Sequence, residues 1–146
     1  MRASRFLNEG EKIQIRKAIQ EAEMNCSGEI RVHISNRCRG DIMDCAAWWF
    51  KKLEMHRTAE RNGVLFFVSV KDRAFAILGD AGINSLVPEN FWDGIKEMMQ
   101  AEFRQGRFAN GIAQGITLAG EQLKKHFPHQ SDDKNELTDD ISFGRK

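Results

Sequence analysis

The sequence predicts an α/β protein, a three-layer α/β/α sandwich with a small mixed sheet and the element order α-β-α-β-β-α-α. Residues 29–35 alternate between apolar and polar side chains, the pattern of a strand with one face less apolar than the other. Residues 63–70 are apolar nearly throughout, which favours a central strand covered on both faces. Because a helical segment separates these two strands, we expect them to run parallel with a right-handed crossover.

Four segments carry apolar side chains at helical spacing: residues 9–26, 41–56, 88–105 and 108–127. The first follows Asn8, with Glu11 three residues later, a combination that satisfies free backbone N–H groups at a helix start. Pro88 suits the first turn of the third helix. Gly111 and Gly115 share one face of the last helix, so this helix is expected to approach the sheet or another helix closely.

A hairpin is predicted by the run from Arg61 to Asn84, RNGVLFFVSVKDRAFAILGDAGIN. Its two apolar strands are separated by Lys71-Asp72, and residues 73–79 are expected to return antiparallel to residues 63–70. The entrance and the exit of a hairpin lie at the same edge of the sheet, so polar residues from both ends are expected to meet there.

Composition points to an ordinary globular protein. The chain has 146 residues, 41% of them hydrophobic and 29% charged, and a net charge of +1. So small a net charge gives no reason to expect binding to nucleic acid or to an anionic membrane. The N-terminus shows no apolar signal segment, and the longest apolar run, residues 64–68, is too short to span a membrane. We therefore expect a cytoplasmic protein.

The composition changes after residue 127. We expect residues 1–127 to form one α/β/α domain and residues 128–146 to form an acidic C-terminal tail that is extended or loosely docked. Leu137, Ile141 and Phe143 are the apolar residues that would hold the tail against the domain.

The three cysteines, Cys26, Cys38 and Cys45, are too few for a disulfide framework and cannot all pair with one another. The spacing of Cys38 and Cys45 matches none of the usual zinc patterns. The sequence therefore predicts reduced cysteines without a zinc site.

Polar residues are predicted to gather where the two parallel strands begin and the returning strand ends. This edge would hold Glu29, Asn62, Asp80 and Asn84, and Asp93 from the third helix would lie within reach. Carboxylate and amide oxygens suit Ca²⁺ or Mg²⁺ better than zinc, so the residues could hold one divalent cation. In the alternative interpretation, Glu29 pairs with Arg61 while Asn62 and Asp80 satisfy the backbone of the turns.

Four short segments resemble the TPM domain, a family named for a thylakoid lumen protein, a photosystem repair protein and a receptor accessory protein. The segments are SGEIRV at residues 27–32, RNGVL at 61–65, GDAGI at 79–83 and FRQGRF at 103–108. Their order and spacing match the family over roughly residues 8–127. The resemblance implies an α/β/α sandwich, which agrees with the order of elements predicted above.

The resemblance also implies a site. Some family members bind divalent cations and some are described as phosphatases. Glu29 stands at the acidic position of the SGE strand start, and Asn62 at the asparagine of the NNG motif. Residues 80–84 occupy the GYGLE stretch, where Asp80 replaces the aromatic residue and Ile83-Asn84 replace the final Leu-Glu. The chain resembles a stand-alone cytoplasmic form, without the signal peptide and membrane helix common in the family.

Three functions follow from these observations. The leading hypothesis is a TPM-like domain of poorly defined activity that binds Ca²⁺ or Mg²⁺ at Glu29, Asn62 and Asp80, helped by Asn84 or Asp93, and acts through other proteins. The second is a metal-assisted phosphatase for phosphomonoesters, in which Arg61 would stabilise charge on the phosphate. The third is a pure protein-interaction module.

Overall fold

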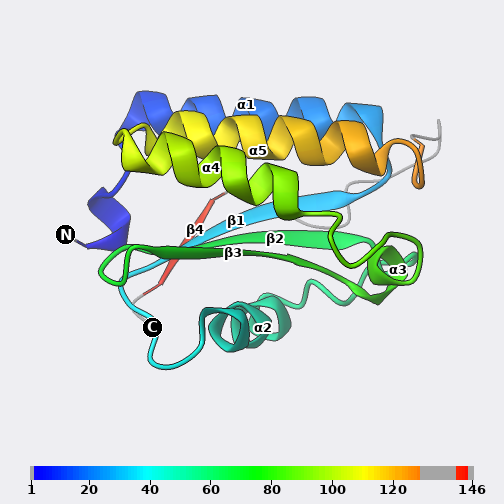
Figure 1. Ribbon diagram of the computed structural model, residues 1–146, viewed down its shortest axis with the longest axis horizontal. Helices are drawn as coiled ribbons and strands as arrows, with labels where there is room; N and C mark the ends of the chain where they lie inside the picture. Colours follow the sequence, from blue (N-terminus) through cyan, green and yellow to red (C-terminus); the bar gives the residue numbers. More distant parts are fainter. Residues whose placement is uncertain (1, 129–140, 145–146) are drawn as a thin grey trace.

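The computed structural model describes residues 2–128 and 141–144. A four-stranded mixed sheet lies between two helical layers, with α1, α4 and α5 over one face and α2 under the other (Figure 1). In chain order the elements are η1 (Ala3–Arg5), α1 (Glu9–Asn25), β1 (Glu29–Ser35), α2 (Ile42–Lys52), β2 (Gly63–Ser69), β3 (Ala74–Gly79), α3 (Ala81–Asn84), α4 (Asp93–Arg104), α5 (Phe108–Leu123) and β4 (Ser142–Gly144). The predicted three-layer α/β/α architecture is confirmed.

The strand order in the sheet is β3-β2-β1-β4. β1 and β2 run parallel, with Glu29 opposite Gly63 and Ser35 opposite Ser69. β3 returns antiparallel to β2, as the hairpin predicted. β4 was not predicted as a strand; it adds in parallel to β1, with Ser142 opposite His33.

β2 determines which helices cover which face. All seven of its residues are buried, and their side chains alternate between the two faces of the sheet. Phe66 belongs to the core shared with α1, α4 and α5, while Phe67 belongs to a smaller core with Ala46 and Phe50 of α2. Such a strand is stable only when both faces are covered.

Three helices differ from the ranges predicted by sequence. α2 ends at Lys52 rather than near His56, because Glu54 takes up a left-handed backbone conformation with φ of 58°. α4 begins at Asp93 rather than at Pro88, because turn hydrogen bonds occupy the intervening residues. α5 ends at Leu123, before the expected Phe127. A one-turn helix, α3, also follows the hairpin.

The tail is partly described. Ile141 is buried and Phe143 packs against the core, which agrees with the expectation that these residues hold the tail to the domain. Leu137, the third residue of that expectation, lies outside the described residues. The backbone of Pro128 forms a bridge with Cys26, so the described part before the gap ends beside the start of β1.

Glycines in α5 allow its neighbours to approach closely. A Cβ atom on Gly120 would lie 2.8 Å from the Cβ atom of Ala22 in α1, and one on Gly115 would lie 2.6 Å from the sulfur of Met99 in α4. A Cβ on Gly111 would meet Phe103 at 2.8 Å. The close approach expected from the glycine spacing is therefore confirmed for Gly111 and Gly115.

Gly120→Ala is expected to lower the free energy of unfolding by about 1–3 kcal/mol, because the added methyl group overlaps Ala22 in a packed core. Gly94→Ala is the matched control, since Gly94 is also helical and a Cβ there meets nothing within 4 Å. The control is expected to gain about 1 kcal/mol from helix propensity. Urea denaturation measures both; equal stabilisation of the two variants would contradict the packing argument.

Candidate functional site

The strand register brings the predicted polar residues to one edge of the sheet. Glu29 lies opposite Gly63, and the N–H of Asp80 donates to the carbonyl of Gly63 at 2.9 Å. Glu29 and Asp80 therefore stand on either side of β2, two strand spacings or about 10 Å apart at their Cα atoms. The edge exists as the topology predicted, but its side chains fall into two hydrogen-bonded groups.

Arg61 and Asp80 form the first group. The Arg61 guanidinium donates two hydrogen bonds to the Asp80 carboxylate, at 2.8 and 2.9 Å. The Asp80 side chain is 5% exposed, whereas that of Arg61 is 50% exposed. The hydrogen bond to Asp80 raises the pKa of Arg61. A buried carboxylate is thus neutralised by a cation that reaches it from solvent.

Asp80 also begins α3. Its Oδ1 accepts a hydrogen bond from the N–H of Ala81 at 2.7 Å, which caps the helix. The N–H of Gly82 donates to the Arg61 carbonyl at 2.8 Å, and a Cβ at this glycine would lie 2.1 Å from the Glu60 carbonyl. Only glycine fits there, so the two ends of the hairpin are joined by direct backbone contact.

Asn62 is the centre of the second group. Its side-chain amide donates to the Ser27 carbonyl and to the Glu60 carboxylate, each at 3.1 Å. The backbone carbonyl of Asn62 accepts a hydrogen bond from the N–H of Glu29 at 3.3 Å. Ser27 Oγ donates to the Glu60 carboxylate at 3.0 Å. Glu60 and Ser27 were not predicted as site residues, although Ser27 begins the SGEIRV motif and Glu60 directly precedes the RNGVL motif.

The side chains of the remaining predicted ligands, Glu29, Asn84 and Asp93, have other surroundings. Glu29 is buried, at 4% exposure. The amide of Asn84 donates to the carbonyl of Gly79 at 3.0 Å. Asp93 is exposed at the start of α4, where its N–H donates to the carbonyl of Asn90. Over residues 2–128 and 141–144, no three His, Cys, Asp or Glu side chains lie close enough together to hold a metal ion.

A second polar region lies at the other end of the strands, beside α2. Cys38, in the loop after β1, forms a disulfide with Cys45 in α2. The prediction of reduced cysteines is therefore wrong for this pair, because the loop between β1 and α2 folds back and brings the two residues together. Cys26 is free and buried.

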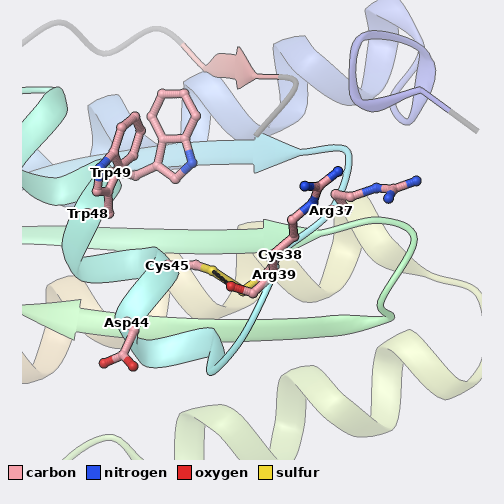
Figure 2. A pocket seen from close by; sticks show the side chains of 7 residues that line it. All are labelled: Arg37, Cys38, Arg39, Asp44, Cys45, Trp48 and Trp49. Carbon is pink, nitrogen blue, oxygen red and sulfur yellow. Dashed lines mark hydrogen bonds between the residues drawn. A yellow bond between two sulfur atoms is a disulfide. The ribbon is translucent and has the colours of Figure 1, made fainter.

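The disulfide borders a hollow of about 440 Å³ (Figure 2). The lining residues are Arg37, Cys38, Arg39, Asp44, Cys45, Trp48 and Trp49. Sequence analysis did not single out these arginines or tryptophans as site residues, because neither residue type forms a recognisable motif here.

His33 connects this hollow to the core. It is 1% exposed and stacks on Trp49, with 3.8 Å between ring centroids. Its Nδ1 lies 2.6 Å from Ser142 Oγ, and that hydroxyl donates to the Val32 carbonyl. Which of the two groups donates in the His33–Ser142 hydrogen bond depends on the tautomer of the imidazole. Burial, aided by the charge of Arg31, lowers the pKa of His33 to about 4.

Sequence comparison identifies the family. The TPM domain family matches residues 2–122, which is most of the chain. The chain belongs to the TPM domain family. Comparison with proteins of curated function gives no significant match.

Two solved structures resemble this TPM domain. The NMR structure of the BA42 protein from the psychrophilic bacterium Bizionia argentinensis is 45% identical in sequence, with a TM-score of 0.90. That match covers 95% of this chain and 96% of the other. The N-terminal domain of a protein from P. gingivalis is 18% identical, with a TM-score of 0.67 over 87% of this chain and 83% of the other, and so supports the fold alone.

Among the helices of the described part of this TPM domain, none has the length and apolar character needed to cross a membrane.

The low pKa of His33 predicts a pH dependence of stability. The unfolded histidine titrates near 6.5 and the folded one near 4. Between these values the unfolded chain binds more protons, so the free energy of unfolding should fall as the pH drops from 6.5 to 4, by on the order of 3 kcal/mol.

Urea denaturation of the native sequence and of His33→Gln across this pH range would measure the effect. The difference between the two isolates His33 from the carboxylates, which titrate in both proteins. An identical pH slope for both proteins would contradict the prediction.

Proposed function

We propose that this TPM domain binds a divalent cation at the edge shared by Glu29, Asn62 and Asp80, and that it acts through protein partners. The observation that supports this proposal is the Arg61–Asp80 pair: a buried carboxylate faces a positive group that is half exposed. The positive charge is needed because a buried, ionised carboxylate without a counter-charge is costly. A cation could supply this charge instead, because half of the Arg61 side chain already contacts solvent.

The exchange has a simple chemical form. Ca²⁺ or Mg²⁺ replaces the guanidinium at Asp80, and Arg61 moves into solvent. Glu29 and the oxygen of Asn62 are the nearest further donors by strand position, with Asn84 and Asp93 as auxiliary ligands. All are oxygen donors, which suits both cations. The ion keeps waters in its remaining positions, as Mg²⁺ in particular does.

Cation titration followed by NMR tests the proposal. Amide shifts are expected at residues 60–63 and 79–82. Asp80→Asn should abolish them while keeping α3, because asparagine caps helices as well as aspartate. Arg61→Met should tighten binding, by up to about fivefold, since an ion pair whose cation is half exposed contributes about 1 kcal/mol or less.

The matched control is Arg107→Met. Arg107 makes a similar two-bond pair with Glu102, at 2.8 and 3.2 Å, away from the edge. This variant should leave cation affinity unchanged. Shifts scattered over the surface, or equal tightening by both arginine variants, would refute the site.

A metal-assisted phosphatase is the second candidate, and the same exchange favours it. Once Arg61 leaves Asp80, its guanidinium is available beside the bound cation, and guanidinium groups bind phosphate oxygens in pairs. The cation would supply Lewis-acid chemistry at the phosphoryl group.

An aryl phosphate assay in Mg²⁺ or Ca²⁺ separates the two candidates. A phosphatase should lose at least about tenfold in kcat/KM in both Asp80→Asn and Arg61→Met, because each removes charge stabilisation from the transition state. A cation-binding domain that acts through partners should show equal background rates in all three proteins.

The location and the partners stay predictions. A cytoplasmic protein was expected from the sequence, whereas a disulfide such as Cys38–Cys45 is more typical of oxidising compartments.

A further inference from the structure

A continuous series of aromatic rings leads from the core to the hollow beside α2. Phe67 of β2 lies parallel to His33, at 6.1 Å between ring centroids and 6° between planes. His33 stacks on Trp49 at 3.8 Å, and Trp49 meets Trp48 edge to face at 5.0 Å. Trp48 is the outermost ring, and the residue is 45% exposed. The inner rings hold the outer ones in place, so Trp48 and Trp49 present an ordered aromatic wall.

Positive charge also lines the hollow. Figure 2 shows the two indole rings on one flank of the disulfide and the guanidinium groups of Arg37 and Arg39 on the opposite flank, while the Asp44 carboxylate points away below the disulfide. Both arginines are exposed. The lining therefore combines aromatic surface with two cations, while its single acid faces away.

The loop that carries these arginines is anchored at two points. The disulfide joins Cys38 to Cys45 on α2. The Asp72 carboxylate accepts hydrogen bonds from the N–H of Cys38 and from Ser69 Oγ. These two anchors at Cys38 hold the backbone between Arg37 and Arg39 in place. Both arginine side chains therefore extend from fixed Cα positions.

We propose that this hollow binds a small aromatic anion, a flat ring system that bears a carboxylate or phosphate group. The ring packs against Trp48 and Trp49, and the oxyanion accepts hydrogen bonds from Arg37 and Arg39. The volume of about 440 Å³ falls in the range of small-molecule sites. The position also fits, because ligands of open α/β sheets bind beyond the carboxyl ends of the strands. The site is independent of the cation edge, which lies where β1 and β2 begin.

Each component of the ligand has a matching group in the site. Stacking on an exposed aromatic side chain tolerates many ring systems. Guanidinium groups bind carboxylate and phosphate oxygens in a planar, two-bond geometry that lysine cannot reproduce. A neutral ring would lose the hydrogen bonds to the guanidinium groups, and free phosphate would lose the stacking on the indole rings.

Tryptophan fluorescence and NMR titrations of the full chain with naphthoate and with naphthyl phosphate test the proposal. Naphthylmethanol and inorganic phosphate serve as the neutral and ring-free probes. Both anions should bind at least about tenfold more tightly than either control probe. Shifts should centre on residues 37–39 and on the Trp48 indole N–H. The anion that binds more tightly then shows whether the site prefers a carboxylate or a phosphate.

Variants on the surface separate the two contributions. Trp48→Ala should weaken naphthoate binding by about tenfold, and the double change Arg37→Gln with Arg39→Gln should bring the naphthoate affinity close to that of naphthylmethanol. All three side chains are exposed, so neither change is expected to unfold the domain.

Arg104→Gln is the matched control. Arg104 lines a different hollow, of about 770 Å³, which also combines aromatic and basic residues, among them Phe75 and Arg73. This variant should leave binding unchanged. Equal affinity for naphthoate and naphthylmethanol, or shifts centred on residues 71–75 and 100–104, would overturn the proposal.

Discussion

The burial of β2 on both faces is the constraint on which the rest of the structure depends. A strand whose seven residues are all buried cannot stand at the surface of a two-layer protein. It requires helices above and below, and it requires β1 and β3 on its two sides to satisfy its backbone groups. The crossover through α2 places β1 beside β2, and the tight turn after β2 places β3 on its other side.

The same constraint separates two kinds of chemistry. One edge of the sheet collects the starts of β1 and β2 and the end of β3, whereas the other collects the ends of β1, β2 and β4 and the start of β3. The first edge holds buried oxygen groups, of which the Asp80 carboxylate is paired with Arg61. The second holds aromatic rings and unburied positive charge beside the disulfide. A polar site at either end costs the core little, because the apolar middle of the sheet lies between them.

Strand positions could be predicted well, because alternation and continuous apolar runs report burial directly. β1 was predicted at its observed bounds, and the edge residues followed from the direction of the strands. Helix ends were less predictable: the end of α2 depends on the left-handed conformation of Glu54, which periodicity does not reveal. The pairing of side chains across the fold was the least predictable feature. Arg61 pairs with Asp80, nineteen residues away, and the Cys38–Cys45 disulfide depends on a loop whose path the sequence does not specify.

The strand β4 has a consequence for the order in which the domain is completed. Ser142 reaches across 109 residues to His33, and a Cβ on Gly144 would lie 2.7 Å from Trp49, so β4 seals one flank of the aromatic series. Chains fold from the N-terminus as they are synthesised, and contacts between distant residues form late. The core around β2 can therefore assemble on the ribosome while His33 and Trp49 still lack their cover. The aromatic wall becomes complete only after β4 has left the ribosome.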